Sequence, residues 1–312
     1  MDNVIQSVIE NVEKVIVGKR QVIEYFLTCI LANGHILFED IPGVGKTMLC
    51  RAMAISLGMS FKRIQFTPDL LPSDITGVSV FNQKVQEFEF KPGPIFANLV
   101  LADEINRATP KTQSSLLECM EERQVTIEGR SIKLPKPFIV MATQNPIEYE
   151  GVFPLPEAQV DRFLMKLSIG YPSYGDEFEI IKSQRYKHPI EDLQPVSSLE
   201  EVISLQEKVK EVYVDETIIQ YILDIVTATR KHSDIAVGAS PRGSLAMYRS
   251  AQTLAYIRGR DYVLPDDVKE VAPLVLAHRI ILKSESYLRG YTQKGVVSTI
   301  LMSIEVPIGK AQ

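Results

Sequence analysis

Residues 35–58 read HILFEDIPGVGKTMLCRAMAISLG, and this stretch decides the fold. Its first part, His35 to Glu39, is short and apolar, as expected for a buried strand, and MLCRAMAISLG has the pattern of a helix. Between them lies a loop that contains two glycines, Gly43 and Gly45. A strand, a glycine-containing loop and a helix in this order predict the opening of an α/β domain with a mostly parallel sheet.

The loop has the features of a Walker A phosphate loop. Glycines let the backbone approach a phosphate, while N–H groups and the helix N-terminus supply positive potential. Lys46 can reach the β and γ oxygens of a nucleotide, and Thr47 can bind Mg²⁺. Asp40 stands where the usual GxxxxGK[ST] pattern has its first glycine, so the turn must accommodate a side chain. An ordinary glycine-rich turn is the alternative, and the flanking strand and helix disfavour it.

Two adjacent acids follow a second apolar strand. Further strands are expected at Phe61 to Phe66, Leu99 to Ala102 and Phe138 to Thr143, and the second of these ends at Asp103 and Glu104. The carboxyl ends of strands are where α/β sheets bind ligands. Asp103 suits a position near the metal, and Glu104 can orient or deprotonate an attacking water. By itself such a pair is more often a solvated strand end, but beside a phosphate loop it favours catalysis.

The chain divides into two predicted domains. Two helices are expected before the first strand, one carrying apolar residues from Val4 to Val15 and one at Lys19 to Ala32. Residues 1–172 then form the α/β domain. Strand signals stop near residues 171–175, and residues 173–312 are expected to form a linker and a small all-helical lid. Helices in this part are predicted at about 198–212, 215–230, 241–258 and 265–278.

Composition excludes several classes of protein. The 312 residues contain 34 Lys and Arg against 39 Asp and Glu, a net charge of −5, so the whole chain has no basic footprint for nucleic acid or anionic lipid. Acids and amides interrupt the N-terminal apolar residues, so a signal peptide is not expected there, and no apolar run approaches the roughly 20 residues needed to span a membrane. A cytoplasmic protein is expected. Three scattered cysteines and four histidines, at no ligand spacing, predict no second catalytic or metal centre.

Four long strings carry a family resemblance. IPGVGKT (41–47), LADEINRATPKTQSSLLECMEERQVT (101–126), ATQNPIEYEG (142–151) and LPEAQVDRFL (155–164) together resemble the MoxR family of AAA+ ATPases. The match covers about Ile36 to Leu167 and continues through GASPRGS (238–244) into the lid, and MoxR-type sequences also use Asp at position 40. The resemblance implies an AAA+ core, a parallel sheet sandwiched by helices with β-hairpin insertions, followed by the lid.

The resemblance also implies roles for single residues. Asn145 matches sensor 1, which is directed at the γ-phosphate or the attacking water; an Asx turn is its alternative. Arg162 matches an arginine finger that acts in a neighbouring subunit, with Arg107 and Arg123 as fallback candidates and an intramolecular ion pair as the alternative. Arg242, at a helix start, matches sensor 2, which reaches from the lid to the phosphates. Together with Glu104 and Lys46, these residues form the expected catalytic set.

A larger set is expected to bind ATP and its Mg²⁺. The segment Ile16-Val17-Gly18 resembles the part of the family that packs on adenine, although a plain turn between helices would look the same. Thr47 and Asp103 are the expected metal ligands. The nucleotide-binding residues implied are Val17, Gly18, Pro42, Gly43, Val44, Gly45, Lys46, Thr47, Met48 and Asp103.

Two β-hairpins are expected to interrupt the core. Gly77 to Phe81 and Val85 to Phe90 alternate around residues 82–84, and a second alternation flanks Gly129 and Arg130. They resemble the helix-2 insert and the pre-sensor-1 hairpin of MoxR proteins. In a ring these would face the central channel, which makes Phe81 a candidate for gripping a client protein. Ordinary packing is the commoner role of strand aromatics.

The function implied by the resemblance is that of an Mg²⁺-dependent ATPase. It would assemble into a ring, with a hexamer expected, and remodel partner proteins, often von Willebrand factor A domain proteins or enzymes that receive a metal or cofactor. A nucleic-acid motor is the first alternative; the acidic charge and the lack of a helix-turn-helix or zinc module argue against it. A nucleotide-gated scaffold with little hydrolysis is the second, and the presence of Glu104, Asn145 and Arg162 argues against it.

Overall fold

Five parallel strands form the central sheet. The computed structural model describes residues 3–84, 86–127, 129–146 and 151–307, and its sheet has the order β2-β5-β8-β1-β9. The three further strands expected from the sequence are confirmed. β9 was not predicted, because a short stretch of four apolar residues and one lysine fits a helix as well as a strand. The strands are β1 (His35–Glu39), β2 (Phe61–Gln65), β5 (Leu99–Asp103), β8 (Ile139–Gln144) and β9 (Phe163–Leu167).

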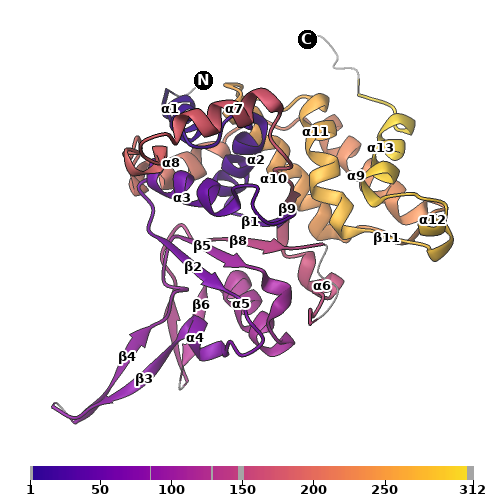
Figure 1. Cartoon of the computed structure of the whole chain (residues 1–312). Helices are drawn as coiled ribbons and strands as arrows, with labels where there is room; N and C mark the ends of the chain where they lie inside the picture. The colour runs from indigo at the N-terminus through magenta and orange to yellow at the C-terminus, as the bar shows by residue number, and fades with distance from the viewer. Residues whose placement is uncertain (1–2, 85, 128, 147–150, 308–312) are drawn as a thin grey trace.

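Helices cover both faces of this sheet. Ile36 and Phe38 of β1 pack into one layer and Leu37 into the other, because successive side chains of a strand point to opposite faces. The first layer contains the two predicted N-terminal helices, α1 (Asn3–Glu13) and α2 (Arg20–Leu31), with α3 (Lys46–Ser56). The second contains α4 (Pro72–Thr76) and α5 (Pro110–Glu122). Figure 1 shows these two layers above and below the sheet.

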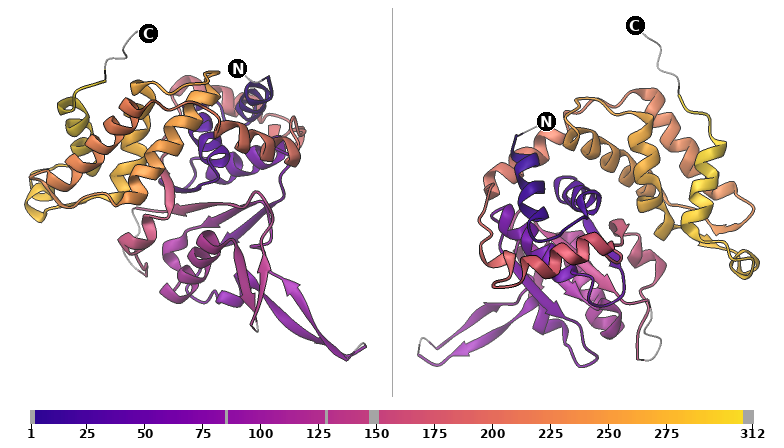
Figure 2. Two further views of the ribbon diagram at one scale, coloured as in Figure 1. Left: turned by 180° about the vertical axis from the view of Figure 1, so that it is seen from behind. Right: turned by 45° about the horizontal axis from the view of Figure 1, so that its top comes forward.

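Both expected hairpins are present. β3 (Gly77–Asn82) pairs antiparallel with β4 (Glu87–Pro92), and β6 (Gln124–Ile127) pairs with β7 (Arg130–Lys133). Val85, which was expected to begin the second strand of the first hairpin, lies outside the described residues. The β3–β4 hairpin projects far from the core on the side away from the C-terminal helices (Figures 1 and 2).

The C-terminal part is helical as predicted, with one addition. Two short strands, β10 (Ile235–Val237) and β11 (Ile281–Leu282), form an antiparallel pair, so the lid is not entirely helical; strands of two and three residues are too short to show alternation. The helices are α7 (Tyr174–Ser183), α8 (Leu199–Val209), α9 (Glu216–Lys231), α10 (Pro241–Ile257), α11 (Pro265–Leu276), α12 (Ser284–Leu288) and α13 (Gln293–Ser303). Single turns complete the chain at η1 (Ile105–Arg107), α6 (Glu157–Val160), η2 (Pro189–Glu191) and η3 (Ala277–Arg279).

The lid packs on the first helical layer. One cluster of buried apolar side chains runs from α1, α2 and α3 into α8, α9, α10 and α11, and α10 packs directly against α2. A domain boundary at residue 172 therefore stays a prediction from the sequence. In the part of the chain that the structure describes, no helix is both long and apolar enough to cross a membrane.

Candidate active site

The phosphate loop and the acidic pair leave the sheet at the same edge. Because the strands are parallel, β1 continues into Asp40 and the loop, β5 ends at Asp103 and Glu104, and β8 leads to Asn145. Asn145 is buried, and the residues at 147–150 that follow it lie outside the described part. We call this side of the sheet the carboxyl edge.

The phosphate loop forms an open cradle. Gly43 and Gly45 adopt φ values of +87° and +93°, in the left-handed region that favours glycine. A Cβ atom at either position would meet nothing within 4 Å, and α3 begins directly after Gly45. Backbone N–H groups at a helix start, with open space in front of them, fit the phosphates of a nucleotide.

Lys46 is held over the loop. Its Nζ donates hydrogen bonds to the backbone oxygens of Asp40 at 2.8 Å and Ile41 at 3.1 Å. Partial burial lowers the pKa of Lys46, and the carboxylates of Asp40, Asp103 and Glu104 oppose this shift. The ammonium group thus lies among acids at the carboxyl edge, where a phosphate would exchange for the carbonyl oxygens.

The hydrogen bonds of Asp40 explain how the phosphate loop accommodates a side chain where the usual pattern has glycine. Its buried carboxylate accepts hydrogen bonds from the N–H of Ile169 at 2.6 Å, the hydroxyl of Ser168 at 2.8 Å and the N–H of Gly170 at 3.2 Å. These residues directly follow β9. Asp40 therefore ties the start of the phosphate loop to the segment that leads into α7.

Asp103 is positioned by two residues that the sequence did not single out. Its Oδ1 accepts a hydrogen bond from the Thr143 hydroxyl at 2.7 Å, and its Oδ2 accepts from Arg63 Nε at 3.0 Å and Nη2 at 2.6 Å. Arg63 lies on β2 and Thr143 on β8, the two neighbours of β5. Only the strand order, which the sequence does not show, brings them together.

Glu104 has an unusual backbone and two side-chain partners. Its φ of +57° is sparsely populated by non-glycine residues and marks a strained position of the kind that clusters at functional sites. Oε2 accepts hydrogen bonds from Gln65 Nε2 at 2.7 Å and Arg107 Nη1 at 3.0 Å. Arg107, a fallback arginine finger, therefore lies beside the acid of its own chain. Gln65 was missed because a lone amide at a strand end carries no sequence signal.

The expected adenine segment adjoins this edge. Gly18 has a φ of +71°, and a Cβ there would lie 2.2 Å from the Asp176 carboxyl carbon. Lys19 Nζ donates to the backbone oxygen of Tyr171 at 2.8 Å, one residue beyond Gly170, which contacts Asp40. Gly18 and Lys19 are thus linked to the phosphate loop through the segment after β9.

Arg162 and Arg242 lie at the opposite, amino edge of the sheet. Arg162 precedes β9, whose first residue Phe163 pairs with His35, the first residue of β1. A five-residue strand spans about 16 Å, and this length separates Arg162 from the phosphate loop. Arg242, expected to reach from the lid to the phosphates, instead forms an ion pair with Glu121 at 2.6 Å. Within one chain, sensor 2 is therefore not at the phosphate loop.

Two contacts hold the start of α10 at the amino edge. The Ser240 hydroxyl, which caps α10, donates to Asp161 Oδ2 at 3.0 Å. The buried Arg279 guanidinium donates to Asp161 Oδ1 at 2.9 Å and to the Phe163 backbone oxygen at 2.6 Å. Burial lowers the pKa of Arg279 to about 10, although the Asp161 charge opposes this shift. The lid is thereby anchored beside β9, far from its own phosphate loop.

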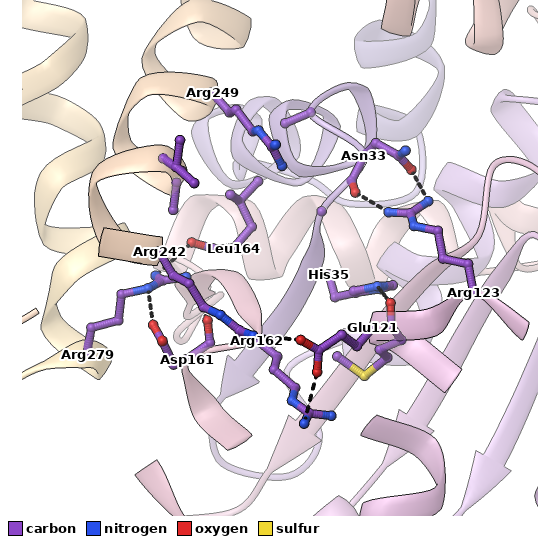
Figure 3. Close-up of a pocket in the computed structure, with 15 residues that line it drawn as sticks. Asn33, His35, Glu121, Arg123, Asp161, Arg162, Leu164, Arg242, Arg249 and Arg279 are labelled. Atoms are coloured by element: carbon purple, nitrogen blue, oxygen red, sulfur yellow. Dashed lines mark hydrogen bonds and ion pairs between the residues drawn. The ribbon is translucent and has the colours of Figure 1, made fainter. Parts of the chain in front are cut away.

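A pocket of about 230 Å³ at the amino edge gathers five arginines. Figure 3 shows Glu121 between Arg162 and Arg242 in this pocket. Glu121 Oε2 lies 3.0 Å from Arg162 Nη2, and Arg162 Nη1 also donates to the backbone oxygen of Leu117 at 2.7 Å. Glu121 and Asp161 are the acids among the lining residues. The arginines of the pocket are Arg123, Arg162, Arg242, Arg249 and Arg279.

Arg123 and Arg249 complete the pocket. Arg123, the second fallback finger, donates to Asn33 Oδ1 at 2.6 Å and to the Asn33 backbone oxygen at 2.7 Å. Burial lowers the pKa of Arg123, and the positive charge of Arg249 adds to the shift. Within the described residues, no hydrogen bond or ion pair engages the Arg249 side chain. Excess positive charge in a confined space fits a bound anion.

The residues at the carboxyl edge fit a magnesium nucleotide. In the described ranges, no group of three or more His, Cys, Asp or Glu side chains is arranged to hold a metal. A divalent ion at this edge would therefore need oxygens from a ligand in addition to the Thr47 hydroxyl and the Asp103 carboxylate. Mg²⁺ commonly binds in this way, through one or two protein groups, waters and the phosphates of its substrate.

Two family models match the chain. Residues 35–165 match the model described as "ATPase family associated with various cellular activities (AAA)", and residues 227–298 match the AAA lid domain. A crystal structure of a protein from Cytophaga hutchinsonii superimposes with a TM-score of 0.92 at 42% identity, covering 98% of this chain and 96% of that one.

Related sequences agree with the models. YeaC of Bacillus subtilis is 52% identical over 97% of this chain and 95% of its own length. Chaperone MoxR1 of Mycobacterium tuberculosis is 45% identical over 97% of this chain and 82% of its own. Protein MoxR of Methylorubrum extorquens is 29% identical over 87% and 86%. With this similarity over nearly its whole length, the chain belongs to the MoxR family of AAA+ ATPases.

Proposed function

We propose that the protein is an Mg²⁺-dependent ATPase whose complete site forms between two copies of the chain. The observation that carries the proposal is the separation of its parts. The phosphate loop and Glu104 lie at the carboxyl edge of the sheet, whereas Arg162 and Arg242 lie at the amino edge. A head-to-tail contact would bring the arginines of one copy to the phosphates bound by the next, and repetition of such a contact closes a ring.

The carboxyl edge supplies binding and activation of water. The N–H groups of residues 43–47 and Lys46 would bind the phosphates, and Thr47 and Asp103 would hold Mg²⁺, whose charge would offset that of the phosphate oxygens. Glu104 orients or deprotonates the attacking water, and Asn145 polarises it or contacts the γ-phosphate. Gln65 and Arg107 hold the Glu104 carboxylate, so its position depends on β2 and η1.

The amino edge supplies positive charge in trans. In phosphoryl transfer, charge spreads over the oxygens of the transferred group, and an arginine from a neighbouring subunit stabilises it. Arg162 and Arg242 share Glu121 and point into one pocket (Figure 3), so both can meet the same phosphate. Arg242 thus keeps its proposed catalytic role, but for the neighbouring nucleotide.

The work done with this energy is proposed to be remodelling of a protein client. The name of the relative Chaperone MoxR1 supports this class of function. A hexamer, a von Willebrand factor A domain partner and a cytoplasmic location are expectations from the family resemblance. The β3–β4 hairpin offers Phe81 and Phe88, both exposed, with ring centroids 5.3 Å apart, as a candidate surface for client contact.

Mixing two inactive variants tests the shared site. Lys46→Ala cannot bind phosphate normally but keeps Arg162, whereas Arg162→Ala keeps the phosphate loop. We expect each alone to hydrolyse MgATP poorly and the mixture to regain activity, with wild-type specific activity rising with protein concentration. The control is a mixture of Arg162→Ala with the double variant Lys46→Ala/Arg162→Ala, which contains no intact finger. If exchange of subunits is demonstrated and the first mixture gains nothing over the control, the shared site is wrong.

A further inference from the structure

Helix α7 exposes an apolar face that no other part of the described chain covers. None of its residues is buried, and Tyr174, Phe178 and Ile181 are 91%, 59% and 69% exposed. Their spacing of four and three residues places them on one side of the helix. Large apolar side chains gathered on one exposed face mark an interaction surface. We call these three residues, together with Glu177, the α7 face.

The α7 face lies next to the proposed nucleotide edge. Asp176, in the first turn of α7, contacts Gly18, and Tyr171, just before α7, receives the hydrogen bond from Lys19. The preceding residue, Gly170, donates to the Asp40 carboxylate at the start of the phosphate loop. In Figure 1, α7 lies beside α1 and α2, at the end of the core opposite the β3–β4 hairpin. A protein that approaches the carboxyl edge from this side meets α7.

Helix α10 carries a face of matching chemistry. Arg242, Leu245 and Arg249 are separated by three and four residues, so they share one side of the helix. Leu245 is 57% exposed, and it lines the arginine pocket together with Arg242 and Arg249. An exposed apolar residue between two arginines complements an exposed apolar stripe that also carries the acid Glu177.

We propose that the α7 face docks on the α10 face of a second copy of the chain. This inference rests on the proposed trans site: if Arg242 reaches the phosphates of the neighbour, Leu245 and Arg249 follow about 4.5 and 10 Å along α10, at about 1.5 Å per residue. Both faces then border one site from opposite sides. Because α7 is tied to Asp40 and Gly18, the contact would link subunit packing to the nucleotide.

Cysteine crosslinking tests this contact directly. The native cysteines Cys29, Cys50 and Cys119 are all buried, so a short bismaleimide would address introduced surface cysteines. We would mix Phe178→Cys protein with Leu245→Cys protein in the presence of MgATP, with Glu104→Gln added to both to slow turnover. The matched control replaces Leu245→Cys by Met302→Cys on α13, a position that is more accessible than Leu245, at 87% against 57% exposed.

We expect at least about tenfold more crosslinked dimer from the first mixture than from the control, because docking raises the local concentration of the paired thiols. A second measurement uses Phe178→Ser/Ile181→Ser, which removes no buried side chain. This variant should bind ATP as a monomer with unchanged affinity but assemble at a protein concentration at least about tenfold higher. Met302→Ser should assemble normally.

The outcomes separate this inference from the proposed function. If the mixed Lys46→Ala and Arg162→Ala proteins regain activity but the crosslink stays at the control level and the α7 variant assembles normally, the docking surface is wrong and the shared site survives. If MgATP produces neither assembly nor regained activity, both are wrong. Crosslinking together with weakened assembly of the α7 variant would establish the α7–α10 contact.

Discussion

The two edges of the central sheet carry opposite chemistry. At the carboxyl edge, Asp40, Asp103 and Glu104 surround a single phosphate-loop lysine, and each acid has hydrogen-bond donors within the chain. At the amino edge, five arginines line one pocket with two acids, Glu121 and Asp161. One chain therefore places the proposed nucleotide-binding groups and the arginines proposed to neutralise phosphate charge about 16 Å apart. The proposed shared site therefore predicts that a copy alone hydrolyses ATP slowly.

Glu104→Gln, at the carboxyl edge, should have the largest effect of the four predicted changes. Turnover of MgATP should fall at least about 100-fold, as expected when a group that orients or deprotonates water is lost. ATP affinity should be unchanged, because the phosphate loop is not altered. Steady-state hydrolysis and equilibrium binding of a fluorescent ATP analogue measure the two quantities. Glu118→Gln, on the exposed side of α5, is the control, and turnover near the wild-type rate in Glu104→Gln would contradict the assignment.

Asp40→Gly should lower the stability of the protein, although it restores the usual phosphate-loop pattern. The N–H groups of Ile169 and Gly170 would lose their acceptor, and an unsatisfied buried donor costs about 1–3 kcal/mol. We expect the free energy of unfolding in urea to fall by about 2 kcal/mol. Glu39→Ala removes only a half-exposed ion pair with Lys166 and should cost at most about 1 kcal/mol. A variant as stable as wild type would show that Asp40 does not clamp the loop.

The comparison of the edges also shows what the sequence can predict. The phosphate loop, Asp103, Glu104 and Asn145 follow strands directly, so a local pattern locates them and parallel pairing brings them together. Arg63 and Gln65 were missed because their role depends on β2 lying next to β5. The sheet order follows from packing across the whole domain, which no short stretch of sequence encodes.

The position of Arg242 differs from its expected place for a related reason. The helix start expected at Arg242 is confirmed, since α10 begins at Pro241 and is capped by Ser240. The side of the core on which α10 begins depends on the contacts of Asp161 with Ser240 and Arg279. In the chain, Asp161 is 79 residues from Ser240 and 118 residues from Arg279. Long-range ion pairs of this kind leave no periodic signal in a single sequence.

Glu121→Gln tests how the two arginines at the amino edge are positioned. Glutamine keeps a hydrogen-bond acceptor but loses the charge that holds Arg162 and Arg242 together. We expect kcat to fall roughly tenfold through misplacement of the two guanidinium groups, with KM for MgATP unchanged, because Glu121 is remote from its own phosphate loop. Glu122→Gln, the exposed neighbour, is the control. A kcat that stays at the wild-type value would contradict this role of Glu121.

Lowering the pH should reduce the free energy of unfolding through His35, at the amino edge. This is the smallest of the four predicted effects. His35 Nδ1 accepts from the Val140 N–H and its Nε2 lies 3.0 Å from the Met120 backbone oxygen, so the ring is neutral. Burial, together with the positive charge of Arg123, lowers the pKa of His35 from 6.5 to about 3. The unfolded chain then binds the extra proton between these values, so stability is lost as the pH falls below 6.5.

Between pH 7 and pH 6, the loss through His35 alone amounts to about 0.7 kcal/mol of unfolding free energy. Urea unfolding of wild type and His35→Gln at both pH values isolates it, because every other titrating group is common to the two proteins. The difference in stability between them should shrink by this amount on going to pH 6. A constant difference would mean that His35 binds the same number of protons in the folded and unfolded chains over this pH range, and would contradict the lowering of its pKa by burial.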